Sequence, residues 1–399
     1  MRIPSGCSRL ETAKIVDKVK GLIFGAILGD SLGLATEGLS RPEIRAIYGD
    51  GPICFGMDED GIAFHRDQFR SKFEENDFGD DAEQVLLVME SLLANGGQFL
   101  QKDFALRLYD YKEHGIKDLH KLPVGMNATN EAVLANPEYK NNPQKAAIEV
   151  WMTRNNLRGA NGALVRAPLL GALKFWDGTT VIENTTKCCR VTHPDPRCMI
   201  SCVIASTLIA RLLRGQDLEI EINHSPAPSI DQQHHPEYNY FIDTLPVNER
   251  LAALVRNVVE TNKPLLTEPQ TDPLFITPET DMKQMQKYYH QLVDCCVPSS
   301  LVDLSLDDSV DCRDTFKCLS AALYCLTRDV PPQSETEYIK KMLTDVVMQG
   351  GEADTNATAA GAMLGARFGY SQLPTEWVVG MKRWEWLEDK VDEFCSLLN

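Results

Sequence analysis

Apolar residues recur at helical spacing along most of the chain, whereas strict alternation of apolar and polar residues is rare. One helical stripe consists of Phe316, Leu319, Leu323 and Leu326. Longer apolar runs at 85–93 and 200–212 predict helices that are buried almost all round. The final segment, 377–398, is also predicted to be helical. A weak strand-like run occurs at 53–55. The pattern as a whole predicts an all-α fold.

Two of the predicted helices carry a glycine at every fourth position. One stripe is Gly21, Gly25, Gly29 and Gly33, and the other is Gly361, Gly365 and Gly369. A glycine inside a helix costs about 1 kcal/mol relative to alanine, so each stripe is favourable only where another backbone packs closely on it. The two helices are therefore expected to be buried, and they could contact each other. The second is predicted from about 356 to 367, with Asp354 or Thr355 as its N-cap.

Residues 216–300 interrupt the helical pattern. This segment is rich in proline, contains His224, His234 and His235, and has few long apolar runs. The three histidines lack the regular spacing of a metal site, so we interpret them as solvated loop residues. We expect a single domain over residues 15–399, within which 216–300 is a polar insertion with a few helical turns.

The balance of charges narrows the possible partners. A net charge of −17 argues against a nucleic-acid-binding surface and against an anionic membrane face. The apolar stretch at 21–34 is interrupted by Asp30 and is too short to span a bilayer. We expect a monomer with neither nucleic-acid nor membrane partners.

The cysteines and the N-terminus indicate a reducing compartment. The chain does not open with the basic and then apolar pattern of a signal peptide. Its 12 cysteines are scattered, and a chain of this length does not need disulfides to fold. A cytoplasmic location is expected, with the nucleus as the alternative. Cys198 and Cys202 could be two zinc ligands one turn apart, but no second pair accompanies them, which favours buried thiols.

Two acidic pairs stand at the starts of two buried helices. The pairs are Asp80 with Asp81 and Glu352 with Asp354. Either pair alone is explained by helix capping, and Asp80 with Glu83 fits a capping box. A fifth carboxylate, Glu37, follows the first glycine-rich helix, where it could be a solvated terminus or reach into a cleft.

The acidic pairs together predict a metal site if the two helices are neighbours. Four carboxylates in one place repel each other strongly unless cations lie between them. Oxygen ligands without nearby histidine or cysteine indicate a hard ion, with Mg²⁺ favoured over Mn²⁺ or Ca²⁺. Two ions about 4 Å apart are common in such clusters, where they orient a water and substrate hydroxyls.

Two further features are weaker signals. The Asn161-Gly162 turn offers several backbone amides, which can hold phosphate oxygens, although most such turns are only turns. His193 stands just before the apolar run at 200–212, where a histidine is more often a hydrogen-bonding loop residue than a catalyst.

Five motifs, in order, resemble those of the ADP-ribosylglycohydrolase family, which includes dinitrogenase-reductase-activating glycohydrolases and J1-crystallins. GDSLGLATE resembles the family's GDALG-x-x-x-E opening, and GDDAEQ its Thr-Asp-Asp motif. ANGALVR resembles its Asn-Gly-x-x-Met-Arg loop, THPDP its Thr-His element, and GGEADTNA its Gly-Gly-Asp-x-Asp-Thr motif. The motifs cover nearly the whole chain outside the polar insertion, and together they are highly specific.

The resemblance implies a compact, orthogonal multi-helix enzyme that uses two Mg²⁺ ions to release ADP-ribose from a modified arginine or serine, or from a related ADP-ribosyl compound. The metal ligands it implies are Asp80, Asp81, Glu352, Asp354 and Thr355. Glu37 and Asp81 are the implied catalytic residues, and Asn161, Gly162 and His193 would contact the substrate.

Two departures leave other functions open. Gly79 stands where the family has threonine, and Glu352 where it has aspartate, so one metal position loses a hydroxyl and another changes its reach. One alternative is a catalytically weak or inactive member that binds ADP-ribose or serves a structural role. Another is a metal phosphohydrolase that uses the same acids and cleaves at phosphate.

Overall fold

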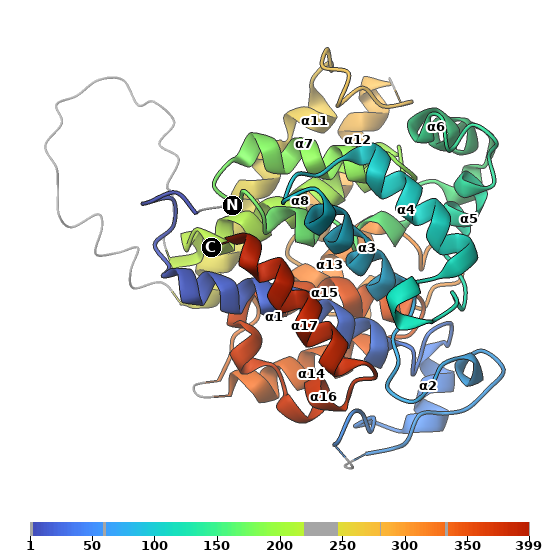
Figure 1. The fold of residues 1–399 in the computed structure, drawn as a ribbon, viewed down its shortest axis with the longest axis vertical. Coiled ribbons are helices and arrows are strands. Elements are labelled where there is room, and N and C mark those ends of the chain that lie inside the picture. Colours follow the sequence, from blue (N-terminus) through green and yellow to red (C-terminus); the bar gives the residue numbers. More distant parts are fainter. Residues whose placement is uncertain (1–2, 59–60, 219–245, 280, 332–333, 399) are drawn as a thin grey trace, which may run out of the picture.

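The computed structural model describes residues 3–58, 61–218, 246–279, 281–331 and 334–398 (Figure 1). Its first helices are α1 (Thr12–Gly33), α2 (Arg41–Tyr48), α3 (Asp80–Ala94), α4 (Gln101–His114), α5 (Ala128–Leu134), α6 (Pro143–Thr153), α7 (Gly178–Cys189) and α8 (Pro196–Leu213). They are followed by α10 (Val247–Asn262), α11 (Pro264–Thr267), α12 (Met282–Cys295), α13 (Thr315–Thr327), α14 (Glu335–Val347), α15 (Ala353–Phe368), α16 (Thr375–Gly380) and α17 (Trp384–Cys395). In these ranges β-pairing is limited to isolated bridges, two of which involve Ile53 and Phe55. The all-α prediction is confirmed.

The two glycine-rich helices, α1 and α15, pack against each other along their glycine stripes. An added Cβ at Gly25 would lie 2.2 Å from the carbonyl oxygen of Gly361, and one at Gly21 would lie 2.4 Å from that of Gly365. Further along, a Cβ at Gly33 would lie 2.3 Å from the Cα of Asp354. The helices are antiparallel, so the end of α1 lies beside the start of α15 (Figure 1).

Lys18 links the two helices at the C-terminal end of α15, away from the contact between Gly33 and Asp354. Its side chain is buried on α1, and its Nζ donates hydrogen bonds to the carbonyls of Ala366 (2.9 Å) and Arg367 (2.6 Å), in the last turn of α15. A cation at a helix C-terminus satisfies carbonyls that have no partner within the helix. Burial lowers the pKa of Lys18 to about 8.

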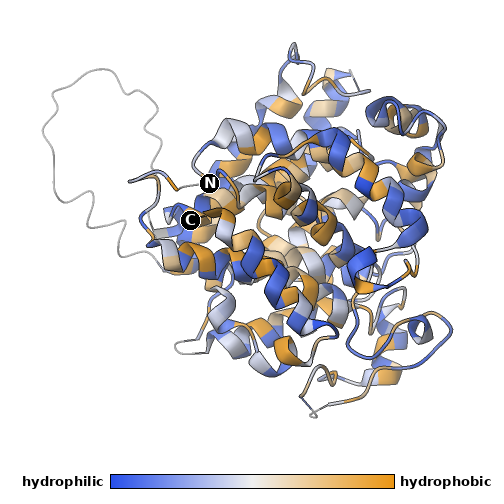
Figure 2. Ribbon diagram, viewed as in Figure 1, coloured by the Kyte–Doolittle hydropathy of each residue, from blue (hydrophilic) through white to orange (hydrophobic). Residues whose placement is uncertain are grey.

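The remaining helices wrap around this pair and share one apolar core. α15 packs against α13 and α14, and α8 packs against α7, α10 and α13. Figure 2 shows hydrophobic residues gathered where these helices meet and hydrophilic residues on outer helix faces. α8 is long and apolar enough to cross a membrane, but 83% of it is buried within the protein, as expected of a core helix.

Part of the expected polar insertion contributes to the core. Leu251, Val255 and Val258 of α10 are buried against the rest of the domain. Residues 219–245, which include the three histidines, lie outside the described residues. The insertion and its boundaries at 216 and 300 stay a prediction.

Several helix boundaries differ from those expected. Glu352, and not Asp354 or Thr355, is the N-cap of α15, which begins at Ala353. α3 begins at Asp80 with Gly79 as its N-cap, so Asp80 does not form the expected capping box with Glu83. At the N-termini of α3 and α15, the acidic side chains are therefore not used as helix caps.

The segment 377–398 is largely helical, as expected, but the chain breaks within it. α16 ends at Gly380, and α17 starts at Trp384 after Arg383, whose φ of 65° is left-handed. Gly380 lies against Gly56, where an added Cβ would be 2.4 Å from backbone atoms. This close approach sets the position of the break.

The backbone contact between α1 and α15 predicts strong sensitivity at Gly25. We expect Gly25→Ala to lower the free energy of unfolding by about 1–3 kcal/mol, because the new methyl group forces the helices apart despite alanine's better helix propensity. Gly178→Ala in α7 is the matched control, since its Cβ would meet nothing within 4 Å. Urea unfolding followed by circular dichroism measures both. Equal stability of the two variants would contradict the role of the stripe.

Candidate functional site

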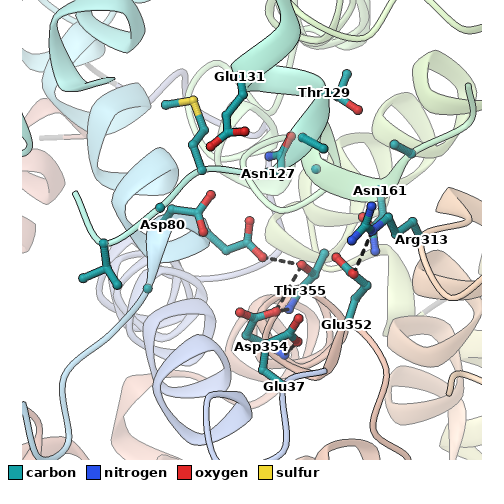
Figure 3. A pocket seen from close by; sticks show the side chains of 18 of the residues that line it. Glu37, Asp80, Asn127, Thr129, Glu131, Asn161, Arg313, Glu352, Asp354 and Thr355 are labelled. Atoms are coloured by element: carbon teal, nitrogen blue, oxygen red, sulfur yellow. Dashed lines mark hydrogen bonds and ion pairs between the residues drawn. The ribbon is translucent and has the colours of Figure 1, made fainter. Parts of the chain in front are cut away.

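A cavity of about 380 Å³ opens where the ends of α1, α3 and α15 meet (Figure 3). The site residues expected from the sequence that line it are Glu37, Asp80, Asp81, Asn161, Gly162, Glu352, Asp354 and Thr355. Residues from both ends of the chain thus face one space. Of the predicted set, only His193 is not part of the lining.

Glu37 reaches the cavity because α1 ends beside the start of α15. The backbone N–H of Asp354 donates to Glu37 Oε2 at 3.3 Å. Buried Arg70 fixes the loop that carries Glu37 by donating to the carbonyls of Ala35 and Glu37, and it also pairs with Asp67. Arg70 therefore positions a carboxylate that it does not itself touch.

The first turn of α3 presents Asp80 and Asp81 to the same space. Thr355 Oγ1 donates to Asp81 Oδ2 at 2.5 Å, which links α15 directly to α3. Beneath them, buried Asp30 of α1 accepts the backbone N–H groups of Gly79 (2.9 Å) and Ala82 (2.7 Å) through Oδ2. Asp30 serves as the side-chain cap of α3 that Gly79 cannot supply.

The carboxylates raise each other's pKa values. Burial, followed by repulsion from Asp354, raises the pKa of Asp80 to about 8. Burial is also the main cause of the raised pKa values of Asp81 and Glu37, with repulsion from Asp80 and from Asp354, respectively, as the second cause. Such shifts mark a place where negative charge is poorly compensated by the protein.

Behind this turn of α3, by contrast, the charges are paired. Buried Lys121 contacts Asp77 Oδ1 at 3.2 Å and Glu83 Oε1 at 3.0 Å, and Arg383 contacts Asp77 Oδ1 at 2.9 Å. Glu83 also accepts a hydrogen bond from Tyr111. Asp77 and Glu83 are thus paired with cations on the core side of α3, whereas within the described residues Asp80 and Asp81 on the cavity side form no ion pair.

The donor set on the cavity side fits a hard divalent cation. It consists of carboxylates and the Thr355 hydroxyl, and neither imidazole nor thiol groups are among the lining residues. Within the described ranges, no three acidic, histidine or cysteine side chains stand close enough to ligate one ion as they are.

The Asn161-Gly162 turn forms another edge of the cavity. The Nδ2 groups of Asn161 and Asn127 are buried and donate to no acceptor in the part of the chain that the structure describes. An added Cβ at Gly162 would lie 2.6 Å from Asn127 Nδ2, so a larger residue at this position would require the Asn127 side chain to move. This edge offers unused N–H donors, opposite in character to the acidic side.

Arg313 lies beside this turn (Figure 3). Its carbonyl accepts the N–H of Asn161 at 2.9 Å, and its Nε donates to Glu352 Oε1 at 3.0 Å. Glu352 is therefore already paired with a cationic side chain. Its pKa is nevertheless raised, by burial and by Asp354.

His193 lies next to the cavity, in a small void behind Thr129 and Leu157, which line both spaces. Arg166 donates to Thr192 Oγ1 at 2.6 Å, so the Thr192 hydroxyl can donate to His193 Nδ1 at 2.7 Å. In this arrangement the ring proton of His193 is on Nε2, which has no hydrogen-bond partner among the described residues. A contact between His193 and substrate stays a prediction.

Asp30, Arg70, Asn127 and Arg313 were not predicted as site residues. Asp30 stood in the GDSLG motif, and its position on the glycine-rich helix was the available signal. Arg70, Asn127 and Arg313 lie in irregular segments, where neither periodicity nor spacing distinguishes them from ordinary loop residues.

Comparison with known families agrees with this geometry. The sequence model described as ADP-ribosylglycohydrolase matches residues 11–399. The chain belongs to the ADP-ribosylglycohydrolase family. The resemblance seen in the motifs is thereby confirmed over nearly the whole chain.

Individual relatives are more distant. The ADP-ribosylhydrolase ARH3 proteins of Bos taurus and Homo sapiens are 35% identical to this chain over 66 residues, which is 16% of this chain and 18% of theirs. A solved structure titled "ADP-ribosylglycohydrolase-related protein complex" aligns with a TM-score of 0.58 at 18% identity, covering 96% of this chain and 99% of that one. It shows that the ADP-ribosylglycohydrolase fold is shared.

Gly79 differs from the threonine of the family's motif, and the structure shows what lies there instead. An added Cβ at Gly79 would lie 2.9 Å from Asp30 Oδ1, an oxygen that is buried without a hydrogen-bond partner. A threonine at this position would require Asp30 to move. Glycine at position 79 therefore lacks the hydroxyl of a threonine and also avoids a clash with Asp30.

The burial of His193 predicts a pH effect on stability. Burial and then Arg166 lower the pKa of His193 well below its usual value, so the folded protein keeps it neutral. The unfolded chain binds a proton below a pKa of about 6.5, so the contribution of neutral His193 to stability is lost as the pH falls below that value. We expect the stability difference between wild type and His193→Gln to shift by about 1.4 kcal/mol against wild type between pH 7.5 and 5.5. Urea titrations at both pH values measure it, and parallel pH profiles would contradict it.

Proposed function

We propose that this family member is a Mg²⁺-dependent hydrolase that releases ADP-ribose from a modified arginine or serine side chain or from a related ADP-ribosyl compound. The observation that carries the proposal is the convergence of Glu37 with the acidic ends of α3 and α15 in one cavity, beside an edge of unused N–H donors. An acidic side suits cations and ribose hydroxyls, and a donor-lined edge suits phosphate oxygens.

Asp80, Asp81, Asp354 and Thr355 would hold the Mg²⁺ ions, with Glu352 as a further ligand. Bound Mg²⁺ supplies positive charge that holds ribose hydroxyls and makes a water more acidic. The proposal follows the resemblance in expecting two ions, with Mn²⁺ or Ca²⁺ as substitutes.

Glu37 and Asp81 are the proposed proton carriers. Cleavage at the anomeric carbon develops oxocarbenium character, and the leaving group must depart protonated. Burial, followed by repulsion from Asp354, raises the pKa of Glu37 well above its usual value, and a raised pKa suits a carboxyl group that donates a proton to a leaving group. Asp81, aligned by Thr355, would accept a proton from the attacking water.

The second candidate is a family member that binds ADP-ribose without turnover. It is favoured by Gly79, which lacks the hydroxyl of the family's threonine, and by the ion pair between Arg313 and Glu352, which occupies a proposed metal ligand. The two functions share a binding site and differ only in whether the glycosidic bond breaks.

Release of ADP-ribose from defined peptides tests the proposal. We expect wild type with Mg²⁺ to release intact ADP-ribose from mono-ADP-ribosylated arginine or serine peptides, and EDTA to abolish release. Asp354→Asn should lower the rate roughly 100-fold or more, because it removes a group that stabilises the transition state. Mass spectrometry identifies the product, and Asp345→Asn, on α14 away from the cavity, is the matched control.

Other outcomes separate the alternatives. Binding of ADP-ribose without release from any peptide would favour the binding protein. Cleavage at the diphosphate, giving AMP, would favour the phosphohydrolase. We also propose that the protein is cytoplasmic and monomeric. Cell fractionation tests the location, and light scattering tests the oligomeric state.

A further inference from the structure

Asp30 has a buried carboxylate oxygen without a hydrogen-bond partner. The side chain lies on α1, beneath the acidic side of the cavity, and is fully buried. Its Oδ2 accepts the N–H groups of Gly79 and Ala82, whereas its Oδ1 accepts no hydrogen bond from any described residue. A buried polar atom of this kind is costly, and its partner is commonly an ordered water or an ion.

The oxygen without a partner faces Gly79. An added Cβ at Gly79 would lie 2.9 Å from Asp30 Oδ1 and 3.4 Å from Leu34 Cδ2. A distance of 2.9 Å is too short for a methyl carbon, but it is ordinary for a water that donates a hydrogen bond. Gly79 itself forms part of the cavity wall, whereas Asp30 does not. The place of the missing side chain therefore suits a water between Asp30 and the cavity.

Asp30 also interacts electrostatically with the carboxylates of the cavity. Burial, followed by repulsion from Asp354, raises the pKa of Asp30 well above its usual value, and repulsion from Asp80 contributes as well. Asp80 and Asp354 are two of the proposed Mg²⁺ ligands. A cation held by them would therefore also offset the negative charge of Asp30.

A water beside Gly79 can do what a threonine hydroxyl does at this position. A hydroxyl donates one hydrogen bond and keeps lone pairs for a cation. A water offers the same combination, and Mg²⁺ usually keeps several waters among its ligands. Asp30 Oδ1 is the acceptor that such a water needs.

We propose that a water beside Gly79 replaces the hydroxyl of the family's threonine and links Asp30 Oδ1 to the cation held by Asp80 and Asp354. The inference rests on the proposed function for the presence of the cation. Asp30 is then a positioning residue with two roles, because its Oδ2 holds the start of α3 and its Oδ1 orients the water. Glycine at position 79 is thus compatible with an occupied metal position.

Mn²⁺ binding, measured by electron paramagnetic resonance, tests the role of Asp30. Asp30→Asn keeps one oxygen for the N–H groups of Gly79 and Ala82 and replaces the other with an amide group that cannot accept a hydrogen bond. We expect Mn²⁺ affinity to fall 10- to 100-fold, the usual effect of removing an outer-shell partner of a metal. Asp314→Asn is the matched control, because Asp314 also accepts two backbone N–H groups at a helix start but lies outside the lining.

Two substitutions at Gly79 test the water without altering Asp30. Gly79→Ala and Gly79→Ser add the same Cβ and crowd Asp30 equally, but only serine supplies a hydroxyl. We expect Gly79→Ser to bind Mn²⁺ at least 10-fold more tightly than Gly79→Ala. In the Gly79→Ala background, Asp30→Asn should cause little further loss, because the methyl group already fills the place of the water.

Several results would overturn the inference. These are unchanged Mn²⁺ affinity in Asp30→Asn, an equal loss in Asp314→Asn, or equal affinities of Gly79→Ala and Gly79→Ser. Wild type that binds no Mn²⁺ would refute both the water link and the Mg²⁺-dependent hydrolase. Wild type that binds Mn²⁺ with the expected dependence on Asp30 and Gly79 but releases no ADP-ribose from peptides leaves the water link standing and refutes only the hydrolase.

Discussion

The close packing of α1 on α15 is the contact on which the rest of the structure depends. Because glycines face each other, the two backbones approach to distances that no side chain could tolerate. The antiparallel arrangement brings the end of α1 to the start of α15, so Glu37 meets Asp354 although more than three hundred residues separate them in the chain. The carboxylate cluster is thus a product of backbone packing at a distance from the cavity.

Electrostatics explain why the cluster faces a cavity. Burying like charges together is costly. On the core side of α3, Lys121 and Arg383 compensate Asp77 and Glu83. On the cavity side, Asp80 and Asp81 form no ion pair within the described residues. The raised pKa values of Asp80, Asp81 and Glu37 are the physical sign of that imbalance. An imbalance confined to one side of a helix is typical of a place that receives a ligand.

The sequence predicted the fold class, and eight of the residues that it singled out line the cavity, because both features leave local signals. Glycine at every fourth position is costly unless it permits close packing, and two acids exceed what one helix cap needs, so these features could be recognised without coordinates. Arg70, Asn127 and Arg313 could not, because their roles depend on partners distant in the chain or on donors left unused after folding. The boundary errors at α3 and α15 are of one kind: Asp80 and Asp354 were considered as caps, whereas Asp80 is the first residue of α3 and Asp354 lies in the first turn of α15.

A four-residue repeat on both helices makes the interface nearly periodic. Sliding α1 along α15 by one four-residue repeat, about 6 Å, would still place small residues opposite small residues. Lys18 breaks that symmetry, because its ammonium reaches the final carbonyls of α15 in one alignment only. Lys18 therefore fixes the register of α1 on α15 from the end of the helix pair that is remote from the acids. That register determines which turn of α1 lies beside Asp354.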